Sequence, residues 1–422
     1  KKWKSSEHRK PLILQGARQV GKTYSILEFG RTCYENVAYF NFETNPKLNE
    51  TFAENISPDY LIPILSHIAG QTIIREKTLI VFDEVQLCER ALTSLKYFCE
   101  DAPEYHIIVA GSLLGVAVNR TRFSFPVGKV DMKTLYPMDM EEFMLAMGEE
   151  QLVELIKKCF QKTAPMPAAL HDAAMQLYRQ YLVVGGMPEC VMQFIQTKDY
   201  ILVRNTQNTI LASYLNDMSK YNNLSEIKKT RLAYDNITVQ LSKKNTRFQY
   251  KLIKKGGRAS EFENAIEWLC LSGIVSQVYK VEQVKKPLEN YRDIDAFKIY
   301  VSDLGLLCAK KELLANDILY MVKELDDFKG GMAENYVNVQ LSINGYHTYY
   351  WESARGAEID FVIQREGKLI PIEVKSADNT RAKSLKVYMD TYEPDYAIKL
   401  SAKNFAFEDR KKIVPLYAAF CI

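Results

Sequence analysis

The sequence lacks the cysteine spacing of zinc sites and of small disulfide scaffolds. Its eight cysteines are spread over 422 residues, and no two of them form a Cys-x-x-Cys pair. The five histidines share no ligand spacing either, so neither residue type predicts a zinc centre. Cysteines without a disulfide pattern favour a reduced, cytoplasmic compartment.

Long apolar runs and a strong charge excess are missing as well. No apolar run reaches the roughly 18 residues that a membrane-spanning helix needs, so no membrane association is expected. The formal net charge is only +3, which by itself predicts neither a nucleic-acid partner nor a membrane partner. Apolar residues make up 47% of the chain and charged residues 25%, which is the composition of a folded protein with buried cores.

The order of strand-like and helical segments predicts an α/β protein with several domains. Residues 1–135 alternate short apolar strands with helices, which indicates a parallel sheet with crossover helices. Residues 136–222 are helical and predict a lid or connector. Residues 223–302 follow the helix and strand order of a small winged helix, and residues 303–422 carry a helix and three successive strand signals.

A phosphate-binding loop is the most specific motif of the chain. Residues 16–23 satisfy G-x-x-x-x-G-K-[ST] between a predicted strand and a predicted helix. In such a loop the backbone N–H groups surround phosphate oxygens, Lys22 contacts the outer phosphates and Thr23 offers its hydroxyl to Mg²⁺. A Gly-rich turn without a ligand is the alternative. The predicted nucleotide-binding residues are Gly16, Ala17, Arg18, Gln19, Val20, Gly21, Lys22 and Thr23.

Two acidic residues follow a second apolar strand, in the segment TLIVFDEV. At the end of a buried strand, Asp83 would hold Mg²⁺ through water and Glu84 would polarise the attacking water. The same pair could instead cap the helix that follows. Ser112 ends the next apolar strand and is expected to sense the γ-phosphate, although an ordinary loop serine would give the same sequence.

Eight segments together resemble one family of ATPases. They read GARQVGKT, VFDEVQ, AGSLLGVAV, SFPVGKVDMKTLYPMDMEEF, YLVVGGMPE, AFKIYVSDLGLL, GGMAENYV and IPIEVKS. These segments resemble those of bacterial and archaeal AAA+ type P-loop ATPases whose C-terminal half is a domain of unknown function. Together they span nearly the whole chain. The resemblance implies ATP hydrolysis, with ATP and Mg²⁺ as ligands.

The chain departs from this family at the arginine finger. Where many relatives have Gly-Arg after the sensor strand, this chain has Gly128 and Lys129. A lysine lacks the bidentate fork of a guanidinium, so we do not expect an arginine-finger role at this position. Arg120 and Arg122 are the nearby substitutes.

A predicted hairpin near the C-terminus has one charged face. If the Glu-Gly pair at 366–367 is a two-residue turn, Asp360 lies directly opposite Glu373. The Cβ atoms of directly opposed residues are roughly 4.5–5.5 Å apart, so the two carboxylates predict a bound cation. The alternative is a solvated sheet face on which Glu358 forms an ordinary cross-strand ion pair with Lys375.

An Asp followed by Glu-x-Lys is the layout of the PD-(D/E)xK nuclease-like fold, which the C-terminal part resembles. The resemblance adds a helical glutamate, Glu334. It implies that Asp360 and Glu373 hold Mg²⁺, that Lys375 orients or activates the attacking water, and that Glu334 completes the metal shell. We therefore expect a restriction-endonuclease-like α/β domain at residues 303–422. Many members of this fold bind DNA without cutting it, so cleavage stays open.

Basic residues gather in the middle of the chain. Residues 241–260 contain seven Lys or Arg residues and no acidic one, with Phe248 and Tyr250 between them. Within a winged helix, the segment from Lys243 to Arg258 predicts a surface for the phosphate backbone of DNA. A solvated helix face or a contact with an acidic domain is the alternative. Two functions follow: an ATPase that acts on DNA through a nuclease-like domain, or a nucleotide-dependent switch that binds a protein partner.

Overall fold

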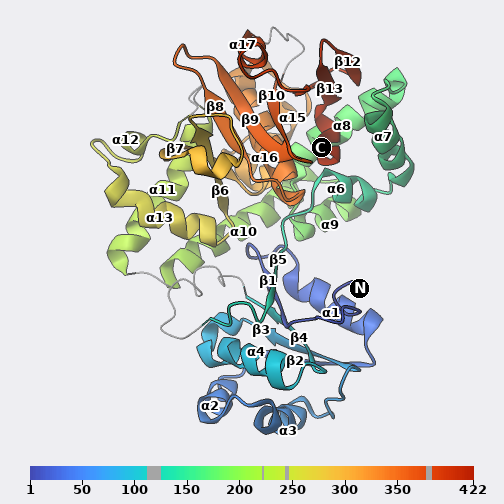
Figure 1. The fold of residues 1–422 in the computed structure, drawn as a ribbon, viewed down its shortest axis with the longest axis vertical. Coiled ribbons are helices and arrows are strands. Elements are labelled where there is room, and N and C mark those ends of the chain that lie inside the picture. The colour runs from blue at the N-terminus through green and yellow to red at the C-terminus, as the bar shows by residue number, and fades with distance from the viewer. Residues whose placement is uncertain (112–124, 221–222, 243–246, 377–382) are drawn as a thin grey trace. The chain divides into compact units, whose positions relative to one another are not determined.

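The computed structural model describes residues 1–111, 125–220, 223–242, 247–376 and 383–422. Its chain forms two compact units (Figure 1). The first comprises residues 1–136 and 271–273, and the second comprises residues 137–270 and 274–422. No helix within the described ranges is long and apolar enough to cross a membrane.

The first unit is built on a five-stranded sheet. Its strands are β1 (Leu12–Gln15), β2 (Asn36–Asn41), β3 (Thr78–Asp83), β4 (His106–Ala110) and β5 (Asp131–Thr134). They lie in the order β2-β3-β4-β1-β5, and every neighbouring pair is parallel. β3 and β4 are buried along their whole length, which explains their continuous apolar sequences. The predicted α/β class with a parallel sheet is confirmed.

Helices connect β1 to β2, β2 to β3 and β3 to β4, as the crossover rule requires. They are α1 (Lys22–Cys33), α2 (Lys47–Glu54), α3 (Pro58–Ala69) and α4 (Glu89–Asp101), with a short turn η1 (Val85–Leu87) after β3. The rings of Phe42, Phe52 and Phe82 contact one another in the core, with centroids 5.5–5.8 Å apart. A Cβ at Gly30 would lie 2.5 Å from Cγ2 of Val37, so this glycine lets α1 pack closely against the sheet.

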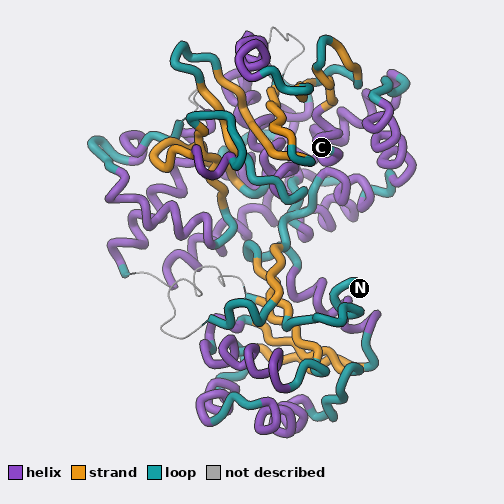
Figure 2. Tube along the Cα trace, viewed as in Figure 1, coloured by secondary structure: helices purple, strands orange, loops and turns teal. Residues whose placement is uncertain are grey.

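The second unit contains helices before its strands and between them. Figure 2 shows helices in purple and strands in orange. Five helices cover the segment predicted as helical: α6 (Met140–Ala146), α7 (Glu150–Lys162), α8 (Ala168–Val184), α9 (Pro188–Thr197) and α10 (Tyr200–Lys220). The segment predicted as a winged helix begins with α11 (Leu224–Ser242), α12 (Tyr250–Ile253) and α13 (Ala259–Leu271). The later helices are α14 (Leu304–Lys310), α15 (Ala315–Leu319), α16 (Asp326–Ile343) and α17 (Lys383–Tyr392), with the short turns η2 (Leu288–Tyr291), η3 (Lys323–Leu325) and η4 (Leu416–Cys421).

One mixed sheet runs through the second unit. Its strands are β6 (Val275–Val281), β7 (Arg292–Val301), β8 (Tyr349–Glu352), β9 (Glu358–Arg365), β10 (Lys368–Val374), β11 (Ala397–Ser401), β12 (Ala406–Glu408) and β13 (Lys411–Pro415). Their order is β12-β13-β11-β10-β9-β8-β6-β7. Since β6 pairs with β8, the hairpin of β6 and β7 continues the C-terminal sheet. The boundary expected between residues 302 and 303 therefore falls inside a single sheet.

A buried carboxylate joins two glycine-containing segments of this unit. Asp303 caps the N-terminus of α14 by accepting the N–H of Leu306 at 2.8 Å, and it accepts the N–H of Gly186 at 2.7 Å. Burial raises the pKa of Asp303 to about 6, although these backbone donors favour its charged form. A Cβ at Gly186 would lie 2.0 Å from the carbonyl oxygen of Met138, so only glycine fits there.

Candidate functional sites

The loop after β1 has the backbone of a phosphate cradle. Gly16 and Gly21 have φ values of 144° and 87°, which glycine adopts without strain. A Cβ at Gly16 would lie 2.1 Å from the carbonyl oxygen of Leu135, so no larger residue fits. Gly21 directly precedes α1, whose first turn carries backbone N–H groups without helical partners. Such a helix start attracts phosphate.

Lys22 is bent back onto this loop. Its side chain is 8% exposed, and Nζ donates to the carbonyl oxygens of Gly16 at 2.9 Å and Ala17 at 2.6 Å. Burial lowers the pKa of Lys22 to about 8, although the carboxylates of Glu84 and Asp83 favour its charged form. The ammonium group therefore lies inside the loop and bonds to groups that phosphate oxygens can replace.

The structure brings Thr23 and Asp83 together. Thr23 Oγ1 donates to Asp83 Oδ2 at 2.8 Å, and Asp83 Oδ1 accepts the N–H of Glu84 at 3.0 Å. The carboxylate is nearly buried, since Asp83 is 5% exposed. A hydroxyl beside a carboxylate supplies the hard oxygen donors that Mg²⁺ prefers. These two residues therefore fit the expected ion.

Neither acidic residue of the Asp-Glu pair caps the following helix. Cys88 precedes α4, and neither α4 nor η1 has a side-chain capping hydrogen bond. Glu84 has a φ of 52°, a left-handed backbone that is uncommon for a residue other than glycine. Its Oε2 accepts a hydrogen bond from Nε2 of Gln86. The capping alternative is therefore excluded by the geometry.

Tyr39 is a further residue of this site that sequence reasoning missed. Its hydroxyl donates to Asp83 Oδ2 at 2.7 Å and accepts from Nδ2 of Asn41 at 3.2 Å. Burial is the main reason that its pKa is raised to about 12. The alternation of β2 could have identified Tyr39 as lying on one face, but its partner follows only from the pairing of β2 with β3.

Several predicted residues of the first unit have no described placement or a different role. Ser112, Arg120 and Arg122 lie outside the described residues. Lys129 forms an ion pair with Glu100 at 2.8 Å.

The predicted C-terminal hairpin has the expected register. The pairs run from Lys368 opposite Arg365 to Ile372 opposite Phe361. Both turn residues, at 366–367, have positive φ, as a two-residue turn of this kind requires. The backbone pairing ends at Ile372 and Phe361, one position before the predicted pair of Asp360 and Glu373. Asp360 Oδ2 accepts the N–H of Val374 at 2.7 Å.

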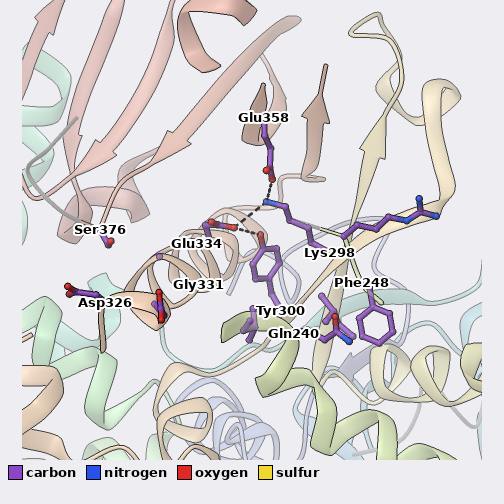
Figure 3. Close-up of a pocket in the computed structure, with 14 residues that line it drawn as sticks. Gln240, Phe248, Lys298, Tyr300, Asp326, Gly331, Glu334, Glu358 and Ser376 are labelled. Atoms are coloured by element: carbon purple, nitrogen blue, oxygen red, sulfur yellow. Dashed lines mark hydrogen bonds and ion pairs between the residues drawn. The ribbon is translucent and has the colours of Figure 1, made fainter. Parts of the chain in front are cut away.

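Lys298 lies between two carboxylates of this region, as Figure 3 shows. Its Nζ is 2.6 Å from Glu358 Oε1 and 3.2 Å from Glu334 Oε2. The hydroxyl of Tyr300 donates to the same Glu334 oxygen at 3.0 Å. Burial alone would lower the pKa of Lys298, but the neighbouring acidic groups, with Glu334 first, raise it well above its usual range. Sequence reasoning did not find Lys298, because it lies in β7, outside the Asp and Glu-x-Lys pattern.

Lys375 forms an ion pair with Glu373, the remaining glutamate of this region. Its Nζ is 2.9 Å from Glu373 Oε1, and Glu373 is 3% exposed. Burial would lower the pKa of Lys375, but Asp360, Glu373 and Glu334 outweigh it and the pKa is raised. Because Glu358 forms its ion pair with Lys298, the ordinary cross-strand pair between Glu358 and Lys375 is not what the geometry shows.

We call the group of six side chains the acidic centre: Lys298, Glu334, Glu358, Asp360, Glu373 and Lys375. Burial is the main reason that the pKa of Asp360 is raised to about 7, and repulsion by Glu334 adds to it. Within the described parts of the chain, no group of three or more His, Cys, Asp or Glu side chains is placed to hold a metal ion. The expected ligands Glu334, Asp360 and Glu373 each have a different partner. As arranged, they do not fit the expected metal.

The described part of the basic segment divides into a buried and an exposed set. Phe248 is 6% exposed and stacks on Phe297 at 5.2 Å, and Tyr250 packs edge-on against Phe248. Phe248 is therefore core and no platform for bases. Exposed basic side chains of this segment are Arg247, Lys251, Lys254, Lys255 and Arg258. Lys243 and Lys244 lie outside the described residues.

Three protein families match separate parts of the chain. Residues 8–144 match the AAA domain. Residues 175–317 and 329–419 match two domains of unknown function, DUF8612 and DUF4143. None of these three matches describes a nuclease or a DNA-binding domain. No curated protein matches the chain.

Solved structures of low sequence identity also match. The Walker-type ATPase PABY2304 of Pyrococcus abyssi is 14% identical, with a TM-score of 0.44 over 74% of this chain and 93% of that one. The ORC2 protein of Aeropyrum pernix is 11% identical, with a TM-score of 0.36 over 77% and 89%. The match to the AAA domain and the loop geometry support an ATPase of AAA+ type.

Proposed function

We propose that residues 16–23, Asp83 and Glu84 form the ATP site of the AAA domain. We further propose that hydrolysis there changes how the second unit, from here on called the C-terminal unit, binds its partner. The observation that carries this proposal is the hydrogen bond between Thr23 and Asp83. It joins the loop after β1 to the end of β3, although β4 lies between these strands. A nucleotide loop and an acidic strand end placed together in this way match the needs of Mg²⁺-dependent phosphoryl transfer.

Each residue has a role that its contacts support. Lys22 exchanges the carbonyl oxygens of Gly16 and Ala17 for phosphate oxygens, since its Nζ already lies in the loop. Thr23 and Asp83 would hold Mg²⁺, which when bound neutralises charge on the phosphates. Glu84 would accept the proton of the attacking water.

A binding titration with an ATP analogue tests the site. Lys22→Met removes the charged donor, and we expect affinity to fall by at least roughly tenfold, because charge-assisted hydrogen bonds to phosphate can no longer form. Lys47→Met is the matched control, since Lys47 is an exposed lysine at the first position of α2. Equal affinities of wild type and Lys22→Met would remove the proposal.

For the C-terminal unit we propose recognition of DNA without cleavage. A contact with the phosphate backbone of DNA is supported by four exposed basic side chains, those of Arg247, Lys251, Lys255 and Arg258. The acidic centre argues against cleavage, because its expected metal ligands are bonded to other groups. A nucleotide-dependent switch that binds a protein partner is the competing function.

Binding of a labelled DNA duplex at several salt concentrations separates the two. Replacing Lys251, Lys255 and Arg258 by Gln should weaken binding and lower the salt slope by about 0.9 for each phosphate that is no longer neutralised. Lys158→Gln with Lys162→Gln, at exposed lysines of α7, is the control and should leave the slope unchanged. If wild type does not bind the duplex, the switch is favoured. Nicking of plasmid by wild type but not by Asp360→Ala would contradict recognition without cleavage.

A further inference from the structure

We propose that Lys298 takes the place of a divalent cation in the acidic centre and keeps such ions from binding there. This inference concerns the C-terminal unit alone and does not depend on the ATP site.

The contacts of Lys298 account for the neutralisation of two carboxylates. Its Nζ bridges Glu358 at 2.6 Å and Glu334 at 3.2 Å, and lies 5.3 Å from the centroid of the Tyr350 ring. The side chain is only 6% exposed. A buried ammonium is stable only when it is paired, so these acidic partners and the lysine hold one another in place.

Glu334 accepts hydrogen bonds from two donors, Lys298 and Tyr300. The oxygen that contacts Lys298 also accepts the hydroxyl of Tyr300 at 3.0 Å. An ion such as Mg²⁺ needs its oxygen ligands at about 2.0–2.1 Å in a nearly octahedral arrangement. Glu334 and Glu358 would have to give up their contacts with Lys298 to bind such an ion, and the ammonium would repel it at short range.

The acidic centre is not closed off from ions in the solvent. A cavity of about 370 Å³ is lined by Lys298, Tyr300, Glu334 and Glu358 among others (Figure 3). A hydrated ion could therefore reach the carboxylates. In addition, Oε2 of the nearly buried Glu373 has no hydrogen-bond partner among the described atoms, so one oxygen of the centre is available. The ammonium of Lys298 contacts both Glu334 and Glu358, which line this cavity, and therefore opposes the binding of an ion there.

Removing the ammonium should convert the centre into a cation site. Lys298→Met keeps a linear side chain and leaves Glu334 and Glu358 without their ion-pair partner, while Lys375 still faces Asp360. We expect this variant to unfold at a lower temperature than wild type without metal, and to regain stability with Mn²⁺. The rise in Tm should be roughly 5–10 °C at about 100 times Kd. Lys298→Met combined with Asp360→Asn should respond much less.

The wild-type protein supplies a test that does not require the variant to fold. Electron paramagnetic resonance measures how many Mn²⁺ ions bind per molecule of nucleotide-free wild type and of Asp360→Asn. Equal numbers of bound ions are expected, and fewer ions on Asp360→Asn would overturn the proposal, because a metal would then bind beside Lys298. A folded Lys298→Met protein that gains no Mn²⁺ response would overturn it as well. If Lys298→Met does not fold, equal counts on these two proteins support it.

Discussion

Lys22 carries an ionisable group whose pKa of about 8 lies within reach of ordinary buffers. Phosphate oxygens favour the ammonium form, so ATP binding should raise this pKa and take up a proton. The uptake should approach half a proton at pH 8 and vanish near pH 6, where Lys22 is already charged. Affinity should fall about tenfold per pH unit well above pH 8. Calorimetry in buffers of different ionisation enthalpy measures the uptake, and its absence at pH 8 would contradict this role of Lys22.

Tyr39 should act as a positioning residue for Asp83. Tyr39→Phe removes the 2.7 Å hydrogen bond to Asp83 Oδ2, which is worth about 1 kcal/mol in a typical case. We expect kcat to fall severalfold while KM for ATP changes little, because the hydroxyl orients the carboxylate. Tyr24→Phe is the control, since Tyr24 is 73% exposed on α1. A raised KM with unchanged kcat would indicate direct contact with the nucleotide instead.

Single residues also mark the limit of prediction from the sequence. The phosphate loop and the Asp-Glu pair were identified because their spacing is a local pattern. Tyr39 and Lys298 were missed because their partners lie in other strands, and only the pairing of those strands brings them near. Asp360 was predicted as one half of an opposed pair, and it turned out to bond to the N–H of Val374.

Among the elements, the turn before α9 should be sensitive to a small substitution. Gly186→Ala places a Cβ 2.0 Å from the carbonyl oxygen of Met138 and disturbs the donor to Asp303. We expect the free energy of unfolding to fall by about 2–3 kcal/mol. Gly330→Ala in α16 is the control, because its Cβ would meet no atom within 4 Å and should be neutral or stabilising. Denaturant unfolding measures both, and similar midpoints would contradict the packing argument.

Elements were predictable where their signals are local. The register of β9 and β10 followed from the Glu-Gly turn, since turn length fixes the pairing of a hairpin. The pairing of β6 with β8 was not predictable, because it joins strands separated by three helices and no turn relates them. For the same reason residues 223–302 were expected to form a separate winged helix, whereas β6 and β7 of this range continue the C-terminal sheet.

At the scale of the whole molecule, four segments were expected and two compact units are present. The proposed ATP site lies in the first unit. ATP at 100 times Kd should therefore raise the free energy of unfolding of that unit by about 2.7 kcal/mol. A piece comprising residues 137–422 should fold, because it carries its own core, and its Tm should not respond to ATP. Scanning calorimetry of the full chain and of this piece tests the assignment, and a Tm rise in the piece would contradict it.

Phosphate release from ATP tests the central claim most directly. With Mg²⁺, wild type should release phosphate at a steady rate, and Glu84→Gln should lower that rate by about 10²–10⁴-fold while binding ATP as tightly as wild type. Equal rates in the two proteins, or no phosphate release by wild type, would contradict the account.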